Sequence, residues 1–476
     1  MQIFFRGFIL SLIFISNQSK AQLTGIKSIP GDYSCIAVAI NALNTQGVGN
    51  GGVIFNVGAG IAFEETVPTG GIVLGSAILN SSLNSTNTLV IQKASTALAN
   101  PLITSYTGGT STPATASAFQ DGIFRLRGCD FVTINGIDLK ENALNTTNPS
   151  TMEYGYAMYK ANVGDGCQNN TIKNCTITLN RINNATAAGI MLTGSVGILI
   201  INSKDSFPTV GLAPTTAPGA NANNRIYNNT IQNCNIGIGV SGYAAAIVAA
   251  IDVNNDIGGQ SAATANMIIN YGGGSAATNP AYGIQTLNQR NLNISYNLID
   301  NNNGSGVNHP LANLYGIYST GGTNGSADLT HNVISLKSNA ISHYVFGIAA
   351  TYVGGVYENV AYNTITNCSC SSMTTGFFYG ISATGPLKVY INNNTIDGIA
   401  VGASVATPQV YPQVYGIYSN SGSIVPDSVF ANGNQIKNIT ITCNSFGYLT
   451  GLSINAGKVH RATGNTLSNF MITGTG

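Results

Sequence analysis

The sequence predicts an all-β protein, a parallel β-helix solenoid of about ten coils with three short strands in each coil. Three observations lead to this prediction. Only 7% of the 476 residues are charged, whereas soluble domains usually have about a quarter. Glycine is abundant, at 57 residues, and tryptophan is absent. A short motif of the form apolar-x-x-Asn-x-apolar recurs along the chain, and a repeat period of roughly 20–50 residues is typical of solenoids.

Residues 1–21 are expected to be a signal peptide. Arg6 supplies the positive start, residues 8–16 form a short apolar run, and residues 19–21 (SKA) fit a small-x-small cleavage site. The run is too short to cross a bilayer, and no later stretch has the ~20 consecutive apolar residues that crossing requires. We therefore expect an exported protein, secreted or at the cell surface, that is not an integral membrane protein.

Residues 22–50 are expected to form an N-terminal cap that contains a short amphipathic helix. Asp32 is a candidate N-cap residue, and Ile36, Ile40 and Leu43 would share one helical face. The open end of a solenoid exposes unpaired strand edges, and a helix there would block association with another edge. Residues 51–476 are expected to form the β-helix, with its C-terminal end uncapped or truncated, because no matching cap segment follows.

The repeated asparagine is the strongest signal for the stack. In the later half of the chain its spacing is 31–40 residues, with a fixed register against the flanking apolar residues. Asparagine tolerates the left-handed conformation of a tight corner, and its amide can bond to the equivalent amide of the next coil. In one coil Cys175 takes its place. The predicted ladder consists of Asn135, Asn229, Asn266, Asn297, Asn332, Asn363, Asn394, Asn434 and Asn465.

A second repeated piece has an aromatic residue before Gly-Ile, which predicts an aromatic stripe along the stack. Such a stripe could bind sugar rings, whose apolar faces pack on aromatic side chains. It could also stabilise the sheet through same-face pairs, and the absence of tryptophan favours this second interpretation. The stripe consists of Tyr282, Tyr315, Phe346, Tyr379 and Tyr415.

The asparagine motif, the aromatic-Gly-Ile strands and the opening GDYSCIAVAINALNTQGVGNGGVIFNVGAG resemble secreted right-handed parallel β-helix proteins of Bacteroidetes type, in the pectin lyase-like superfamily. The resemblance covers nearly all of the expected mature chain. It implies right-handed coils of three strands and export. The superfamily includes pectate lyases, polygalacturonases and adhesive proteins, so the resemblance does not select a chemistry.

Catalytic candidates come from the charge-dense region 121–181. Asp138, Glu141 and Glu153 could serve as acid or metal ligand, and Lys140 or Arg181 as base or charge stabiliser. A network of ion pairs that docks a loop on the coil is the favoured alternative. Acidic residues three places after the repeated asparagine never fall on neighbouring coils, so this register predicts no pair of carboxylates.

No metal or cofactor is expected, because the histidines and the eight cysteines lack metal-ligand spacing. The cysteines are expected to be small buried residues rather than a disulfide framework. A net charge of +1 does not predict the basic surface that binds nucleic acid, so no nucleic-acid partner is expected. The sequence thus favours a secreted or cell-surface, non-catalytic scaffold or adhesin, with polysaccharide or a cell-surface glycan as its candidate partner. The alternative is a carbohydrate-active enzyme, a polysaccharide lyase or a glycoside hydrolase. The oligomeric state is left open.

Overall fold

The computed structural model describes most of the chain. The residues outside the description are 1–20, 108–120, 148–149, 181–193, 245–246, 273–279, 302–311, 404–410, 421–427, 456 and 475–476. The expected signal peptide, apart from its last residue, therefore lies outside the described residues.

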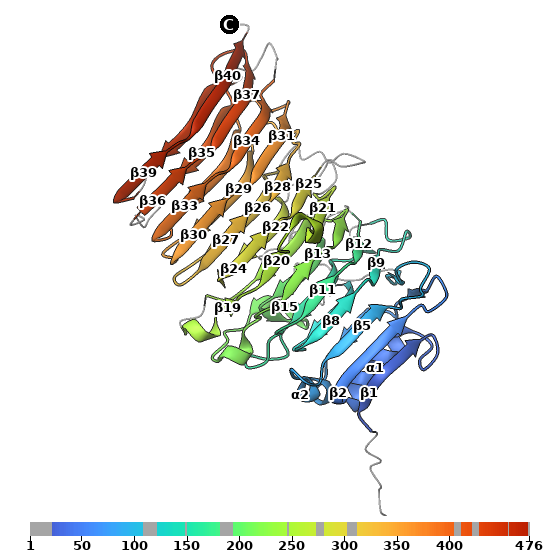
Figure 1. The fold of residues 1–476 in the computed structure, drawn as a ribbon. Coiled ribbons are helices and arrows are strands. Elements are labelled where there is room, and N and C mark those ends of the chain that lie inside the picture. The colour runs from blue at the N-terminus through green and yellow to red at the C-terminus, as the bar shows by residue number, and fades with distance from the viewer. Residues whose placement is uncertain are drawn as a thin grey trace, which may run out of the picture.

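The chain folds into a right-handed parallel β-helix. Among the described residues, three long parallel sheets hold 13, 12 and 11 strands, which we call sheets A, B and C. The chain visits A, B and C in turn, and each new strand pairs with the equivalent strand of the previous coil. Figure 1 shows the resulting stack, from the blue N-terminal coils to the red C-terminal ones. The described strands of sheet C amount to 11 turns, close to the predicted ten.

The strands of each sheet are short, as the repeat predicts. Sheet A contains β1 (Leu23–Ile29), β2 (Val48–Val57), β5 (Leu89–Lys93), β8 (Val132–Asn135), β11 (Thr171–Lys173), β16 (Arg225–Tyr227), β20 (Asp256–Gly258), β24 (Leu292–Ser295), β27 (Ser326–Thr330), β30 (Tyr357–Ala361), β33 (Lys388–Asn392), β36 (Ser428–Asn432) and β39 (Val459–Thr463). Sheet B contains β3 (Glu64–Thr66), β6 (Leu102–Thr104), β9 (Asp138–Lys140), β12 (Thr176–Thr178), β17 (Thr230–Gln232), β21 (Met267–Ile269), β25 (Leu298–Asp300), β28 (Val333–Ser335), β31 (Thr364–Cys370), β34 (Thr395–Val401), β37 (Gln435–Cys443) and β40 (Thr466–Gly474). Sheet C contains β4 (Ile72–Leu74), β7 (Gly122–Arg127), β10 (Tyr154–Tyr159), β13 (Val196–Ile201), β18 (Ile236–Ser241), β22 (Ala281–Leu287), β26 (Leu314–Gly321), β29 (Tyr344–Tyr352), β32 (Phe377–Thr384), β35 (Gln413–Ser419) and β38 (Tyr448–Ile454).

The other described elements lie outside the three long sheets. They are helices α1 (Ile36–Gln46) and α2 (Ala77–Ser82), the strand pairs β14 (Ser203–Lys204) with β15 (Phe207–Gly211) and β19 (Asp252–Val253) with β23 (Gln289–Arg290), and the 3-10 turns η2 (Ala217–Gly219), η3 (Val248–Ala250) and η4 (Ala262–Thr264).

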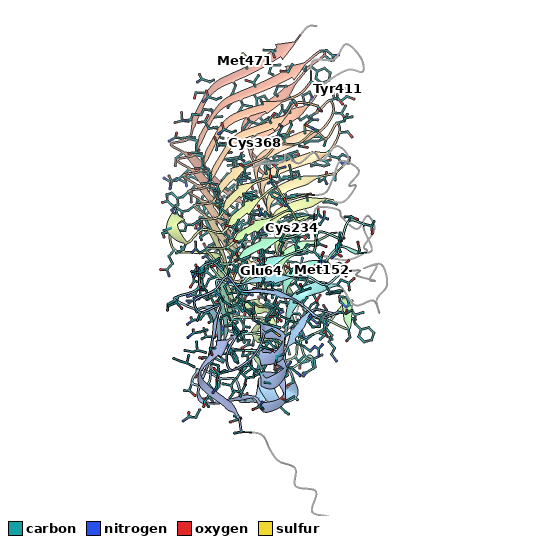
Figure 2. All side chains as sticks on the ribbon, turned by 90° about the vertical axis from the view of Figure 1, so that its right-hand side faces the viewer. Glu64, Met152, Cys234, Cys368, Tyr411 and Met471 are labelled. Atoms are coloured by element: carbon teal, nitrogen blue, oxygen red, sulfur yellow. The ribbon has the colours of Figure 1, made fainter. Side chains whose placement is uncertain are left out.

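The core runs along the axis of the stack, because alternate residues of each strand point inward. Equivalent isoleucines stack in register from coil to coil, for example Ile299, Ile334, Ile365 and Ile396 in sheet B, and all four are fully buried. All eight cysteines are free thiols, and only Cys35 is not buried. Figure 2 shows side chains filling the interior, with Cys234 and Cys368 inside the stack.

Asparagine amides bond to one another at the corner between sheets A and B. Asn363 Oδ1 accepts from the backbone N–H (2.9 Å) and the Nδ2 (3.0 Å) of Asn332. Its Nδ2 donates to Leu329 O (2.8 Å) and to Asn394 Oδ1 (3.0 Å). Both ends of the buried amide are therefore satisfied. The same amide contacts run without a break through Asn229, Asn266, Asn297, Asn332, Asn363, Asn394, Asn434 and Asn465.

Two details of the predicted ladder need correction. At all of the ladder corners but that of Asn266, the left-handed residue is the one before the ladder asparagine, such as His331 (φ 57°) or Tyr362 (φ 59°). The aligned Asn135 lies outside the ladder, because it pairs with Lys173, two residues before Cys175. The equivalent of Cys175 is therefore the fully buried Ile137. Only the local pattern of residues 132–137 matches the repeat there, and the strand register is shifted by two.

Helix α1 covers the N-terminal coils and buries Ile36, Ile40 and Leu43, as its pattern predicts. Its cap differs from the prediction. The N-cap position is Cys35, and Asp32 instead accepts bonds from the backbone and hydroxyl of Ser28. Glu65 caps the helix from another coil, because its carboxylate accepts the first free N–H groups, those of Ile36 (2.7 Å) and Ala37 (2.9 Å).

The glycines of the aromatic-Gly-Ile pieces allow close packing between coils. A Cβ on Gly347 would lie 2.5 Å from Gly380 O and 2.7 Å from Ile365 Cδ1. The backbone oxygen cannot move aside without disturbing the sheet. The same crowding holds for Gly283, Gly316, Gly380 and Gly416.

We predict that Gly347→Ala lowers the free energy of unfolding by about 1–3 kcal/mol, the usual cost of overpacking a core. Gly322→Ala is the control, since a Cβ there would meet no atom within 4 Å. The control is expected to leave stability unchanged or slightly raised, because alanine restricts the unfolded chain. Urea unfolding of both variants checks this, and equal stability of the two would contradict the packing argument.

No helix in the described part of the chain is both long enough and apolar enough to cross a membrane.

Candidate functional site

The structure describes four of the five predicted catalytic residues. Asp138 and Lys140 lie on β9 with their side chains away from the core, on the outer face of sheet B. Asp138 Oδ1 accepts from Asn100 Nδ2 (2.9 Å) and from the backbone N–H of Thr176 (2.7 Å). Burial raises the pKa of Asp138, and these two bonds lower it in part. Its carboxylate thus holds neighbouring coils together.

Glu141 and Glu153 are the first and last residues of the connection between β9 and β10, and both are buried. The Glu141 carboxylate accepts from the backbone N–H groups of Met152 (2.6 Å) and Asn180 (2.7 Å), and burial raises its pKa to about 7. Glu153 is 2% exposed and accepts from the N–H of Asp121 (2.6 Å). Both carboxylates therefore bind backbone N–H groups and stabilise the loop. Arg181 lies outside the described residues.

Arginines of the same region make ion pairs on the outer face of sheet C. Asp205, in the turn between β14 and β15, accepts from Arg127 Nε at 3.1 Å and lies 3.4 Å from Arg125 Nε. Arg125 also contacts the hydroxyl of the buried Tyr154 (3.4 Å). These contacts hold the β14–β15 hairpin on sheet C, which is the kind of network that the alternative interpretation describes. Among the described residues, no group of three His, Cys, Asp or Glu side chains is placed to hold a metal ion.

The aromatic stripe forms a continuous stack of rings on the outer face of sheet C. The rings of Tyr315 and Phe346 are 5.0 Å apart at an angle of 3°, and the rings of Phe346 and Tyr379 are 4.8 Å apart at 8°. Tyr282 and Tyr415 continue the stack at the two ends with the same geometry. Each inner ring is thus covered on both faces, and only ring edges and hydroxyls reach the surface. This is the geometry of sheet-stabilising pairs, with few faces left for a sugar.

A groove with a different aromatic arrangement lies on the outer face of sheet A. It covers β27, β30 and β33, which lie side by side in Figure 1, and has a volume of about 670 Å³. Small-molecule sites usually measure roughly 300–1,000 Å³. We call it the sheet A groove, and it is lined by Asp328, Val356, Tyr357, Asn359, Leu387, Lys388 and Tyr390.

Tyr390 gives this groove an open aromatic face. Its ring stacks on Phe430 of the next coil, with ring centres 5.5 Å apart and an angle of 12°. On its other side the residue in register is Asn359, which has no ring. Tyr390 therefore ends its stack, and the ring, which carries no second ring on this side, lines the groove.

Polar groups stand beside this ring. The Asp328 carboxylate accepts from the Tyr357 hydroxyl (2.8 Å) and from Asn359 Nδ2 (2.9 Å). Burial and this carboxylate raise the pKa of Tyr357 to about 12, so its hydroxyl remains a donor at neutral pH. Lys388 is exposed and has no carboxylate within 4 Å among the described residues. The groove thus combines an apolar face with donors and acceptors in fixed positions.

Sequence reasoning missed this groove, although a signal was present. Asp328, Asn359 and Tyr390 each lie four residues before a ladder asparagine, so the repeat places them in one outward column. The register that was predicted for paired carboxylates lies three residues after each ladder asparagine, so it does not include this column.

No protein-family model matches this sequence, and no curated protein matches it. Solved structures with a similar fold include a GH136 lacto-N-biosidase from Eubacterium ramulus, with 11% identity and a TM-score of 0.44, covering 91% of this chain and 64% of that one. PfbA, a surface adhesin of Streptococcus pneumoniae, has 14% identity and a TM-score of 0.42, covering 92% and 88%. A variant of the periplasmic alginate epimerase AlgG has 11% identity and a TM-score of 0.38, covering 94% and 84%. The chain thus spans less than two thirds of the lacto-N-biosidase, and similarity at this level concerns the fold alone.

Proposed function

We propose that this protein is an exported, non-catalytic β-helix scaffold of the adhesin type, which binds a polysaccharide in the sheet A groove. The observation that carries the proposal is the face of Tyr390 on which no second ring stacks, beside the Asp328 carboxylate and the Asn359 amide in the groove. The expected signal peptide supports export.

A sugar ring has an apolar face and a rim of hydroxyls, and the groove offers partners for both. The open face of Tyr390 can take the apolar face, and the exposed Val356 and Leu387 extend the apolar contact. The carboxylate oxygens of Asp328 can accept hydrogen bonds from the sugar hydroxyls. Its position is fixed by two hydrogen bonds, which lowers the entropy cost of binding.

The arrangement of acids supports a binding role over a catalytic one. Hydrolysis of glycosidic bonds usually needs two carboxyl groups, roughly 5–10 Å apart. Asp328 is the only carboxylate among the described residues that line the groove. In the region with the predicted catalytic residues, the carboxylates of Glu141 and Glu153 accept bonds from backbone N–H groups.

The test is a glycan array, followed by calorimetric titration of the best ligand with Tyr390→Ala. We predict that this substitution weakens binding by about tenfold or more, since the loss of a ring contact of ~1.4 kcal/mol corresponds to a factor of ten. Phe446→Ala is the matched control, because this exposed ring stacks on Tyr411, away from the groove.

Two results would contradict the proposal. If no glycan binds, or if Tyr390→Ala binds as well as the wild type, the groove is not the site. If incubation with the bound glycan releases reducing ends or unsaturated products, the non-catalytic role is wrong and the enzyme alternative takes its place.

A further inference from the structure

We propose that the sheet A groove is one end of a longer track that binds an extended, uncharged polysaccharide chain parallel to the axis of the β-helix. This inference rests on the proposed function and adds the length, the direction and the chemical class of the ligand.

The track is a single column of outward side chains on sheet A. Successive strands β16, β20, β24, β27, β30 and β33 pair in register, which puts one residue of the column on each. With strands about 4.8 Å apart, five steps span roughly 24 Å, several sugar rings long. The column consists of Arg225, Asp256, Asn293, Asp328, Asn359 and Tyr390.

A second groove lies at the other end of the same column. It has a volume of about 250 Å³ and is lined in part by Arg225, Asp256, Gln260 and Thr264. The coil of Asn293 lies between the strands that carry the two grooves. A chain that follows the column would therefore enter both grooves, whereas a chain that crosses it would meet only one.

The column repeats one chemical unit along its length. Asn293 Nδ2 donates to Asp256 Oδ1 (2.6 Å), and two coils later Asn359 Nδ2 donates to Asp328 Oδ1 (2.9 Å). Each pair presents a carboxylate and an amide side by side to solvent. A polymer with hydroxyls at regular intervals could repeat the same hydrogen bonds at both pairs.

The charges along the column favour an uncharged chain. Asp256 and Asp328 occupy its interior, and Arg225 and Lys388 stand only near its two ends. Among the described residues Asp328 has no lysine or arginine within 4 Å, unlike Asp397 on sheet B, which pairs with Lys437 at 3.6 Å. A polyuronate would place its carboxylates against those of the track, and like charges at close range repel.

The experiment compares chain lengths. Cellohexaose, mannohexaose and xylohexaose, their disaccharides, and hexagalacturonate are titrated into the full chain. We predict that at least one neutral hexasaccharide binds about tenfold or more tighter than its disaccharide and than hexagalacturonate. Arg225→Ala and Asn293→Ala should weaken binding of the hexasaccharide severalfold and leave the disaccharide unchanged, whereas Tyr390→Ala should weaken both. Asp397→Asn, on sheet B, is the control that should change neither.

The outcomes separate the two proposals. If a disaccharide binds as tightly as the hexasaccharide, or if Arg225→Ala and Asn293→Ala both leave hexasaccharide binding intact, the axial track is wrong and the groove alone remains. If hexagalacturonate binds best, the uncharged class is wrong. If none of these chains binds although the glycan array gives a ligand, the inference is wrong and the proposed function stands. If the array gives no ligand either, or Tyr390→Ala has no effect, the proposed function fails and the inference fails with it.

Discussion

Replacing Asn363 by leucine is expected to lower the free energy of unfolding by about 3 kcal/mol or more. Leucine has the same number and branching of side-chain heavy atoms, but its methyl groups form no hydrogen bonds, so four buried groups lose a bond. These are the backbone N–H and the amide of Asn332, the carbonyl of Leu329 and the amide oxygen of Asn394. Each buried polar group left without a partner costs about 1–3 kcal/mol. Urea unfolding, followed by circular dichroism, measures the change.

Asn135→Leu is the control for this prediction. The sequence motif assigned Asn135 to the ladder, but the structure places it on the outside of sheet A, where its Oδ1 accepts from the exposed Asn174 (2.5 Å). A substitution at such a site usually changes stability by about 0.5 kcal/mol or less. An equal loss in both variants would show that the motif, and not the buried amide contact, determines the effect.

The repeat made most of the fold predictable, because a solenoid uses the same local solution in every coil. Asn332, Asn363 and Asn394 lie 31 residues apart, and the isoleucine two places after each enters the core in register. Amide contacts between coils were harder to predict from the sequence where the loops between them vary in length. A second set of amide contacts joins Asn170, Asn224, Asn255 and Gln289 at the corner between sheets C and A, and the loops between them hide the period.

The contacts that the sequence could not predict are between residues far apart in the chain. Asp32 is a good local N-cap candidate for helix α1, yet Glu65, 29 residues after Ile36, binds the free N–H groups. The same reason applies to the charge-dense region. The density of charges there indicated a site, but the function of a carboxylate depends on its partners, and those of Glu141 are backbone N–H groups at positions 152 and 180.

One buried acid, Glu358, differs from these carboxylates because the neighbouring coils supply no hydrogen-bond partner for it among the described residues. Glu358 lies on β30 with its side chain inside the core, in register between Ala327 and Val389. It is 0% exposed, and neither of its carboxyl oxygens has a hydrogen-bond partner among the described residues. It interacts electrostatically with the buried hydroxyl of Tyr352. An ionised carboxylate in such surroundings is costly, so burial raises the pKa of Glu358 well above its usual value.

The consequence for stability has a definite sign. In the unfolded chain Glu358 loses its proton near pH 4.5, whereas in the folded chain it keeps the proton to higher pH. Between these two pKa values, a rise in pH therefore stabilises the unfolded state, in which Glu358 ionises, and not the folded state, in which it stays protonated. The contribution of Glu358 to stability is greatest below the unfolded pKa and is lost as the pH rises through the folded one. Burial likewise raises the pKa of Asp130, Glu141 and Asp252, which act in the same direction.

We predict that Glu358→Gln removes this share of the pH dependence. Above about pH 5, the free energy of unfolding of the wild type should fall by about 1.4 kcal/mol per pH unit relative to the variant, until the pH reaches the folded pKa of Glu358. Urea unfolding at a series of pH values measures this difference, in which the other buried acids cancel because both proteins contain them. Glu64→Gln is the control, since this glutamate is exposed on β3 and should leave the curve unchanged. Parallel curves for the wild type and Glu358→Gln would mean that Glu358 ionises as readily in the folded chain as in the unfolded one.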